Sequence, residues 1–238
     1  QKETIKKSDL AGLPPCVQKW LERSGIVGKE KIHTVRLIQS GRMRTEEGKP
    51  WMPMEAVQYI NVDNPGFIWR AKVKPAPFIN LVGKDKYCQG QGSMLIKLLA
   101  LFPVVDAQSG KEINQGSLLR FLAEMAWYPS AALNDYIKWE EINEHSAKAT
   151  MTWQGTSASM VFYFDEQGDF NSSLARRYRE ADGKFVLDDW GGIARGYQEF
   201  NGVRISNKLD VTWKLKSGDF NWMQVQVTRI DYNQPEIF

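Results

Sequence analysis

The sequence is poor in the residues that most often hold metal ions or perform nucleophilic catalysis. Its 238 residues include only two histidines, His33 and His145, and two cysteines, Cys16 and Cys88. None of the four stands at ligand spacing from another, so the sequence predicts no metal site. The chain also lacks a G-x-S-x-G nucleophile elbow, a complete dinucleotide-binding glycine motif and a P-loop. We therefore expect no metal and no cofactor.

Long apolar runs and long blocks of like charge are also missing. The longest apolar stretch, residues 94–105, is interrupted by Lys97 and Pro103 and is too short to cross a membrane as a helix. The net charge of +3 comes from acidic and basic residues mixed along the chain, with a short basic stretch at residues 176–179. This distribution argues against a nucleic-acid partner.

Two features of the sequence leave alternatives open. Cys16 and Cys88 could form a disulfide, but sequence does not show whether they lie close enough, and buried free thiols are an equally good expectation. The chain begins at Gln1 rather than at methionine. We expect a processed or trimmed chain from which an N-terminal signal or anchor could have been removed.

The sequence is instead rich in aromatic residues, which make up 12% of the chain, and in segments where apolar and polar residues alternate. This period of two predicts β-strands and is clearest in residues 67–73 and 146–153. About ten such segments fill the chain outside two helical regions. A sheet this wide must curl or close. The predicted fold class is α+β, with a large curved antiparallel sheet (a half-open β-barrel) in a single domain over residues 1–238.

Local features of the strands carry specific expectations. Gly41 lies within an alternating segment and suggests a β-bulge. Residues 84–85 are expected to form the turn of a hairpin. The glycine-rich residues 90–92 suit a bend or a close backbone approach. Residues 93–105 are expected to run as a strand into a short helical or irregular piece.

Two helical segments interrupt the strands. Residues 14–25 are expected to form an N-terminal helix, because prolines suit a first turn and Gly25 suits the end, whereas residues 1–13 are polar and expected to be loose. The clearest helix is a central insertion at residues 117–136, where Ser117 suits the N-cap and Pro129 separates a second short helix. Because its first part is apolar around most of its girth, we expect it to lie buried inside the curved sheet.

Arg120 and Glu124 interrupt the apolar surface of the central helix. They stand at positions i and i+4, so they lie on one face, one turn from each other. One interpretation is an exposed surface ion pair worth about 0.3–0.5 kcal/mol. The other is a partly buried pair facing a cavity, where charged groups need partners and often mark function. Both interpretations stay open at this point.

A set of short motifs is spread from Pro14 to Tyr232. The motif of the central helix includes Arg120, Glu124, Trp127 and Pro129. The other motifs are Trp20-Leu21, Ser24-Gly25, Val27-Gly28, Gly41-Arg42-Met43-Arg44, Pro65-Gly66-Phe67, Trp69, Ala71, Gly90, Gly92, Phe121-Leu122, Ala131-Ala132-Leu133, Trp213 and Gly218-Asp219-Phe220. Together they resemble a mostly bacterial family of unknown function whose members are often membrane-anchored. The resemblance assigns no role to the residues of the central helix.

The strand order with a helix inserted in mid-chain is also similar to the lipoprotein-carrier superfamily of LolA and LolB. That resemblance implies a half-open β-barrel whose helices plug an apolar cavity. Together the two resemblances imply an extracytoplasmic or membrane-anchored location and possible proximity to a membrane. A shared fold does not by itself establish a shared function.

The leading functional hypothesis is a binding protein for an apolar or amphipathic small molecule or lipid. An aromatic-rich curved sheet around an apolar helix offers a cavity with few polar groups. Arg120 would meet a head group, Glu124 would fix Arg120, and Arg176 or Arg177 would add charge at the rim. The aromatic candidates for the cavity wall are Trp69, Tyr87, Trp127 and Trp139. The alternative is that these aromatic side chains only fill the barrel, as they do in small barrels.

Two other functions stay open. The first is an enzyme that uses Arg120 to hold an anion and Glu124 as a general acid or base. Asp85 and residues 140–141 are further candidate carboxylates, and their spacing does not select among them. The second is an extracytoplasmic interaction domain without a pocket, which would expose a large apolar patch.

Overall fold

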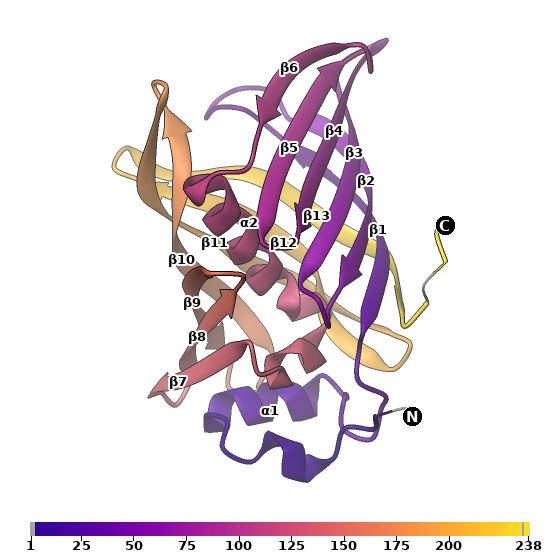
Figure 1. Ribbon diagram of the computed structural model, residues 1–238, viewed down its shortest axis with the longest axis vertical. Coiled ribbons are helices and arrows are strands. Elements are labelled where there is room, and N and C mark those ends of the chain that lie inside the picture. The colour runs from indigo at the N-terminus through magenta and orange to yellow at the C-terminus, as the bar shows by residue number, and fades with distance from the viewer. Residues whose placement is uncertain (1–2, 235) are drawn as a thin grey trace.

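Thirteen antiparallel strands form one continuous sheet that curves around a helix (Figure 1). The structure is a computed structural model that describes residues 3–234 and 236–238, and the count of strands refers to these residues. The strands are β1 (Thr34–Met43), β2 (Met52–Asn61), β3 (Gly66–Ala76), β4 (Ile79–Cys88), β5 (Gln91–Leu98), β6 (Phe102–Ala107), β7 (Ile137–Asn143), β8 (Ser146–Trp153), β9 (Thr156–Phe164), β10 (Phe170–Ala181), β11 (Lys184–Phe200), β12 (Val203–Leu215) and β13 (Gly218–Tyr232). The predicted half-open antiparallel barrel is confirmed.

The order of the strands explains the position of the central helix. The sheet runs β6-β5-β4-β3-β2-β1-β13-β12-β11-β10-β9-β8-β7, so the first and last strands of the chain pair in its middle. Strand β6 forms one edge and β7 the other. The segment between them carries helix α2 (Lys111–Glu124) and the 3₁₀ turns η2 (Met125–Trp127) and η3 (Pro129–Leu133). The chain therefore crosses the concave side of the sheet to reach its second half (Figure 1).

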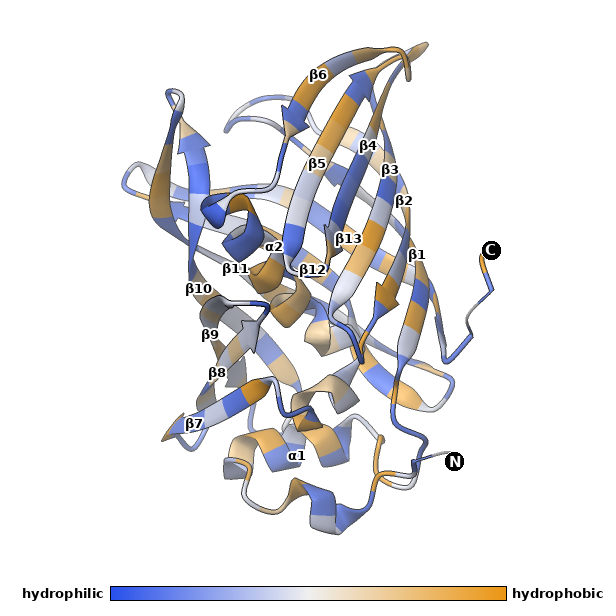
Figure 2. Ribbon diagram, in the orientation of Figure 1, coloured by the Kyte–Doolittle hydropathy of each residue, from blue (hydrophilic) through white to orange (hydrophobic). Residues whose placement is uncertain are grey.

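Helix α2 is buried on more than one side, as its composition predicts. Leu118, Leu119, Phe121 and Leu122 are all fully buried. The helix begins at Lys111 rather than at the predicted Ser117, and it ends at Glu124. The second short helix that was expected after Pro129 is the 3₁₀ turn η3. The first turns of α2 are polar and have no apolar periodicity that would have marked them as helix. Figure 2 shows this change from hydrophilic to hydrophobic along α2.

Two turns differ from the prediction. Residues 84–85 do not reverse the chain: β4 runs straight through them, and the reversal comes at Gln89 and Gly90, which both have positive φ. The charged pair Lys84-Asp85 suggests a turn between two more apolar segments, but the side chain of Asp85 is buried and ion-paired. Residues 93–105 form the β5–β6 hairpin rather than a strand followed by a helical piece.

The predicted bulge at Gly41 is also wrong. The register of β1 with β13 shifts between Ile38 and Gln39 and is continuous around Gly41. Gly41 instead marks a close approach, because a Cβ there would overlap the carbonyl oxygen of Gln224.

The N-terminal segment closes one end of the half-barrel (Figure 1). Helix α1 (Pro15–Arg23) packs Trp20 onto the ring of Phe164, with 5.6 Å between centroids. Residues 1–2 lie outside the described part, but residues 3–13 are not loose as predicted. They include the 3₁₀ turn η1 (Lys7–Leu10), and Ile5 and Leu10 are buried. These two apolar side chains anchor a segment that is otherwise polar.

The two cysteines do not pair, since Cys16 is buried and Cys88 is exposed, and both are free. Within residues 3–234 and 236–238, no helix combines the length and the apolar character needed to span a membrane.

Replacing Gly92 with alanine is expected to lower the free energy of unfolding by about 1–3 kcal/mol, the usual cost of forcing extra bulk into a packed site. A Cβ at Gly92 would overlap the Ser117 hydroxyl of α2, and the Gly92 amide donates to Asn114 Oδ1 at 2.8 Å. Gly92 thus lets β5 touch α2, as predicted for residues 90–92. In the matched change Gly83→Ala in β4, the new Cβ would meet only Trp69 at 3.6 Å. Urea unfolding that shows equal losses for both variants would contradict this account.

Candidate ligand-binding cavity

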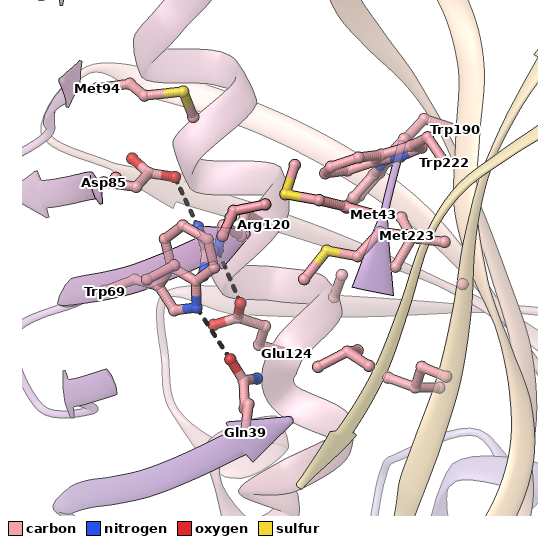
Figure 3. Close-up of a pocket in the computed structure, with 18 of the residues that line it drawn as sticks. Gln39, Met43, Trp69, Asp85, Met94, Arg120, Glu124, Trp190, Trp222 and Met223 are labelled. Atoms are coloured by element: carbon pink, nitrogen blue, oxygen red, sulfur yellow. Dashed lines mark hydrogen bonds and ion pairs between the residues drawn. The ribbon is translucent and has the colours of Figure 1, made fainter. Parts of the chain in front are cut away.

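A cavity of about 270 Å³ lies between α2 and the concave face of the sheet. Its walls come from both halves of the sheet and from α2, and they are mostly apolar. Figure 3 shows part of this lining, including Met43, Trp69, Met94, Trp190, Trp222 and Met223. Methionine side chains are flexible and polarisable, so such a wall can adapt to the shape of an occupant.

Arg120 on α2 forms a closed polar network at one side of this cavity (Figure 3). Its Nε donates to Glu124 Oε1 at 2.7 Å and its Nη1 donates to Asp85 Oδ2 at 2.6 Å. Its Nη2 donates to Gln58 Oε1 at 3.2 Å, and Gln58 Nε2 donates to Glu124 Oε2 at 2.5 Å. The guanidinium also lies 5.0 Å from the ring centroid of Trp69. The network therefore joins α2 to strands β2 and β4.

The network is buried, so the interpretation of Arg120 and Glu124 as an exposed surface pair is excluded. Gln58 is 0%, Asp85 4% and Glu124 8% exposed. Burial raises the pKa of Glu124 from its usual range, while the charge and hydrogen bond of Arg120 and the hydrogen bond from Gln58 act in the opposite direction. One guanidinium faces two carboxyl groups here, so the positive charge of Arg120 is already matched within the protein.

Four of the predicted site residues line the cavity: Trp69, Arg120, Glu124 and Trp127. The two indoles each have an acceptor inside the protein. Trp69 Nε1 donates to Gln39 Oε1 at 2.9 Å, and Trp127 Nε1 donates to the Ser206 carbonyl oxygen at 3.0 Å. These hydrogen bonds fix both rings, which leaves their apolar faces for packing.

Three predicted residues do not line this cavity. Tyr87 is buried against Phe67, and this burial raises the pKa of its hydroxyl to about 12. Trp139 packs on Phe162, with 5.5 Å between ring centroids. Arg176 is exposed and lies 3.5 Å from Asp189 on the outer side of β10. Their side chains contribute to packing or to the surface instead.

Arg177, the alternative to Arg176, does line the cavity, together with Trp190 and Trp222, which sequence reasoning did not select. The guanidinium carbon of Arg177 lies 4.4 Å from the ring centroid of Trp190. Adjacent residues of a strand point to opposite faces, so one of the two arginines had to face inward. The sequence signal for Arg177 was its shared phase with the small residues Ser173 and Ala175 of the same strand.

The sequence profile of a family of unknown function, DUF6544, matches residues 3–225 of the chain. The chain belongs to this family. The resemblance predicted from the motifs of α2 and the flanking strands is thus confirmed. Among curated proteins, none matches this DUF6544 chain.

Solved structures show what the fold of this DUF6544 protein is similar to. A domain described as an outer membrane lipoprotein-sorting protein, from Vibrio parahaemolyticus, superimposes with a TM-score of 0.50 at 10% identity, covering 93% of this chain and 92% of that chain. A LolA superfamily protein from Nitrosomonas europaea gives a TM-score of 0.43 at 8% identity, with 92% and 94% covered. The likeness to the Vibrio domain confirms the predicted lipoprotein-carrier type of fold, and at this identity it concerns the fold alone.

Proposed function

We propose that this protein is a single-domain binding protein that holds an apolar or amphipathic, lipid-like molecule in the cavity beside α2. The observation that carries the proposal is the cavity itself, an apolar space with a few polar groups at fixed places. Its volume of about 270 Å³ is close to the lower limit of the roughly 300–1,000 Å³ that is typical of small-molecule sites. That size suits one alkyl chain better than a lipid with several chains.

The Arg120 network supports a cavity that persists without an occupant. Apolar side chains on α2 and on the sheet would gain by closing the space between them. The ion pairs to Asp85 and Glu124, together with Gln58, tie α2 to β2 and β4 at a fixed distance. Breaking these contacts would leave buried charges without partners, which is costly. The network therefore acts as a spacer that keeps α2 from collapsing onto the wall.

An enzyme that uses the Arg120 and Glu124 pair is less well supported. Both carboxyl oxygens of Glu124 accept a hydrogen bond from the protein, one from Arg120 and one from Gln58. A general acid or base needs an oxygen within hydrogen-bonding reach of the substrate. Both oxygens of Glu124 are already engaged by donors of the protein, which disfavours their use in proton transfer to or from a substrate. The presence of a cavity likewise disfavours an interaction domain without a pocket.

We also propose that the protein works near an extracytoplasmic membrane surface. The β3–β4 and β5–β6 turns lie side by side, since the Leu99 amide donates to the Asn80 carbonyl oxygen at 2.8 Å. They expose Phe78 (98%), Leu101 (72%) and Phe102 (62%) at the end of the sheet seen in orange in Figure 2. Exposed apolar patches of this kind mark membrane or protein contacts. The likeness to a lipoprotein-sorting domain supports the location.

Charge favours a membrane over a protein partner for this tip, which we define as residues 78–82 and 99–105. Val82 on its outer face pairs with Lys72 of β3 on one side and with Lys97 of β5 on the other. Lysines beside exposed apolar side chains suit the interface of a membrane with anionic lipids. The expected partner is therefore a lipid surface and not a nucleic acid.

Native mass spectrometry of the purified protein, before and after extraction with organic solvent, tests the binding function. A bound mass that disappears on extraction is the expected result. Titration of the extracted protein with the neutral fluorescent probe N-phenyl-1-naphthylamine should then show saturable binding. A protein that carries no ligand and also fails to bind the probe would overturn the proposal.

Replacing Phe78 and Phe102 together with serine is expected to weaken binding to vesicles that contain phosphatidylglycerol by about tenfold or more. Full burial of one phenylalanine side chain contributes roughly 1.5–3 kcal/mol of free energy. Binding of the wild-type protein should also weaken in high salt. Vesicle co-sedimentation measures both effects. The matched change Ile142→Ser removes a side chain that is 51% exposed on β7, away from the tip. An equal loss in that variant, or no vesicle binding by the wild type, would contradict the membrane proposal.

A further inference from the structure

Arg177 is a positive charge in the cavity wall with no acceptor of its own. Among the described residues it makes no hydrogen bond or ion pair, and its closest contact of note is the face of Trp190. Asp188 stands opposite Arg177 in the register of β10 and β11. That carboxylate instead accepts two hydrogen bonds from Arg179, at 3.0 and 2.7 Å. The nearest candidate counter-ion on the strand is therefore already engaged.

The surroundings of Arg177 are costly for a charge. Burial lowers the pKa of its guanidinium to about 10, an effect that Asp85 and Glu124 partly offset and Arg120 increases. The group still carries its charge at neutral pH. Helix α2 passes directly over it at Gly116, where a Cβ would stand 3.4 Å from Arg177 Nε. Arg177 is half-buried, and a charge that is partly withdrawn from water without a partner costs stability. Such a cost commonly persists where a function needs it.

Two further donors in the same cavity lack acceptors. The indole N–H groups of Trp190 and Trp222 are buried and unpartnered within the described residues, and both rings line the cavity. Figure 3 shows them across the cavity from the Arg120 network. Trp69 and Trp127, in contrast, have acceptors in the protein. Among the described residues, the buried polar groups of the wall that lack a partner are therefore donors. An occupant that supplies acceptors would satisfy their hydrogen-bonding capacity.

We propose that the ligand is a single-chain amphiphile with an anionic head group, a carboxylate or a phosphate ester, which binds Arg177 beside Trp190 while its alkyl chain fills the apolar cavity. This inference rests on the proposed binding function and specifies its ligand class. Arginine binds both head groups through paired N–H donors. Arg120, which sequence reasoning assigned to the head group, instead has its charge satisfied by Asp85 and Glu124.

The test is displacement of N-phenyl-1-naphthylamine by dodecanoate, dodecyl phosphate and the uncharged dodecanol. We expect the wild-type protein to prefer one or both anions over dodecanol by at least about tenfold, the order of magnitude that charge-assisted hydrogen bonds supply. Comparing the two anions distinguishes a carboxylate from a phosphate ligand. Equal affinity for all three compounds would overturn the head-group proposal and leave the binding function standing. Failure of all three and of the probe would overturn both.

Variants of adjacent arginines separate a binding role from a structural one. Arg177→Met should lose the preference for the anions and keep the affinity for dodecanol, whereas Arg177→Lys should retain part of the preference. Arg176→Met is the matched control, because Arg176 is exposed on the outer face of the same strand; it should keep the preference. A preference that survives in Arg177→Met would overturn the proposal.

Thermal melting of the ligand-free variants supplies a second readout. Because Arg177 is half-buried and unpartnered among the described residues, its removal should raise the melting temperature of Arg177→Met or leave it unchanged. A structural arginine would behave in the opposite way, as its loss would lower the melting temperature. A large drop in Arg177→Met, with no drop in Arg176→Met, would therefore assign Arg177 to the stability of the fold and overturn the proposal.

Discussion

Replacing Arg120 with methionine is expected to lower the free energy of unfolding by about 3–5 kcal/mol at pH 7, the usual cost of removing one partner from a buried ion pair. Methionine retains most of the apolar stem of arginine but none of its donors. Asp85 and Glu124 would then stay buried, close to each other and without a cation. Urea unfolding followed by circular dichroism measures the loss.

The loss in Arg120→Met should shrink as the pH falls from 7 to 5. Burial already raises the pKa of Glu124, and the variant lacks the arginine that opposes this rise. A carboxyl group whose pKa is higher in the folded than in the unfolded state binds a proton on folding in the window between the two values. Stability therefore rises as the pH falls through that window. A loss that grows on acidification would contradict the assignment of the charges.

Arg195→Met is the matched control for this prediction. Arg195 Nε donates to Asp210 Oδ2 at 2.7 Å, the same distance as between Arg120 and Glu124, but its side chain is 55% exposed. Exposed ion pairs contribute at most about 1 kcal/mol. A second variant, Arg120→Met with Glu124→Gln, should recover part of the loss because it removes one unpaired carboxyl group. Equal losses in Arg120→Met and Arg195→Met would show that burial of the network does not matter.

Replacing Ala123 with phenylalanine is expected to lower the affinity for the probe at least about a hundredfold. This corresponds to a loss of some 2.7 kcal/mol of binding free energy. Ala123 lies on α2, is partly buried and lines the cavity. A phenyl ring at this position would occupy the space that the ligand needs. Filling an existing cavity adds packing contacts, so stability should change by less than about 1 kcal/mol. Titration with N-phenyl-1-naphthylamine and urea unfolding measure the two quantities.

Ala126 provides the contrast within the same segment. It is 2% exposed and does not line the cavity, so Ala126→Phe should overpack the core and cost about 1–3 kcal/mol or more. Ala11 is exposed, so Ala11→Phe should leave both stability and probe binding unaltered. If Ala123→Phe binds the probe as tightly as the wild type, the probe binds elsewhere and the cavity is not the site.

Some parts of the structure could be predicted because they depend on local periodicity. The alternation in residues 146–153 predicted β8 (Ser146–Trp153), and the apolar girth around Leu118 to Leu122 predicted a helix buried inside the sheet. Both follow from the fixed periods of strands and helices. The spacing of Arg120 and Glu124 likewise placed them on one helical face, where the structure joins them at 2.7 Å.

Other parts of the structure were predicted wrongly because the role of a residue depends on a contact with a distant part of the chain. Asp85 with Lys84 resembled a turn, and only the strand order reveals that Asp85 faces Arg120 in α2. The polar start of α2 likewise had no apolar stripe to mark it. A polar residue in an apolar segment signals either a turn or a buried partner, and the sequence of that segment alone does not distinguish them.

By itself the sequence determined the period of most strands and of the apolar part of α2, and with it a curved antiparallel sheet around an apolar helix. The tertiary structure alone decided which phase of each strand faces the cavity, because a shift by one residue moves every side chain to the other face. That choice separates Arg177, with its unpaired charge in the wall, from Arg176 at the surface. It also brought Gln58 and Asp85 from separate strands to Arg120, a contact that exists only because the sheet closes around α2.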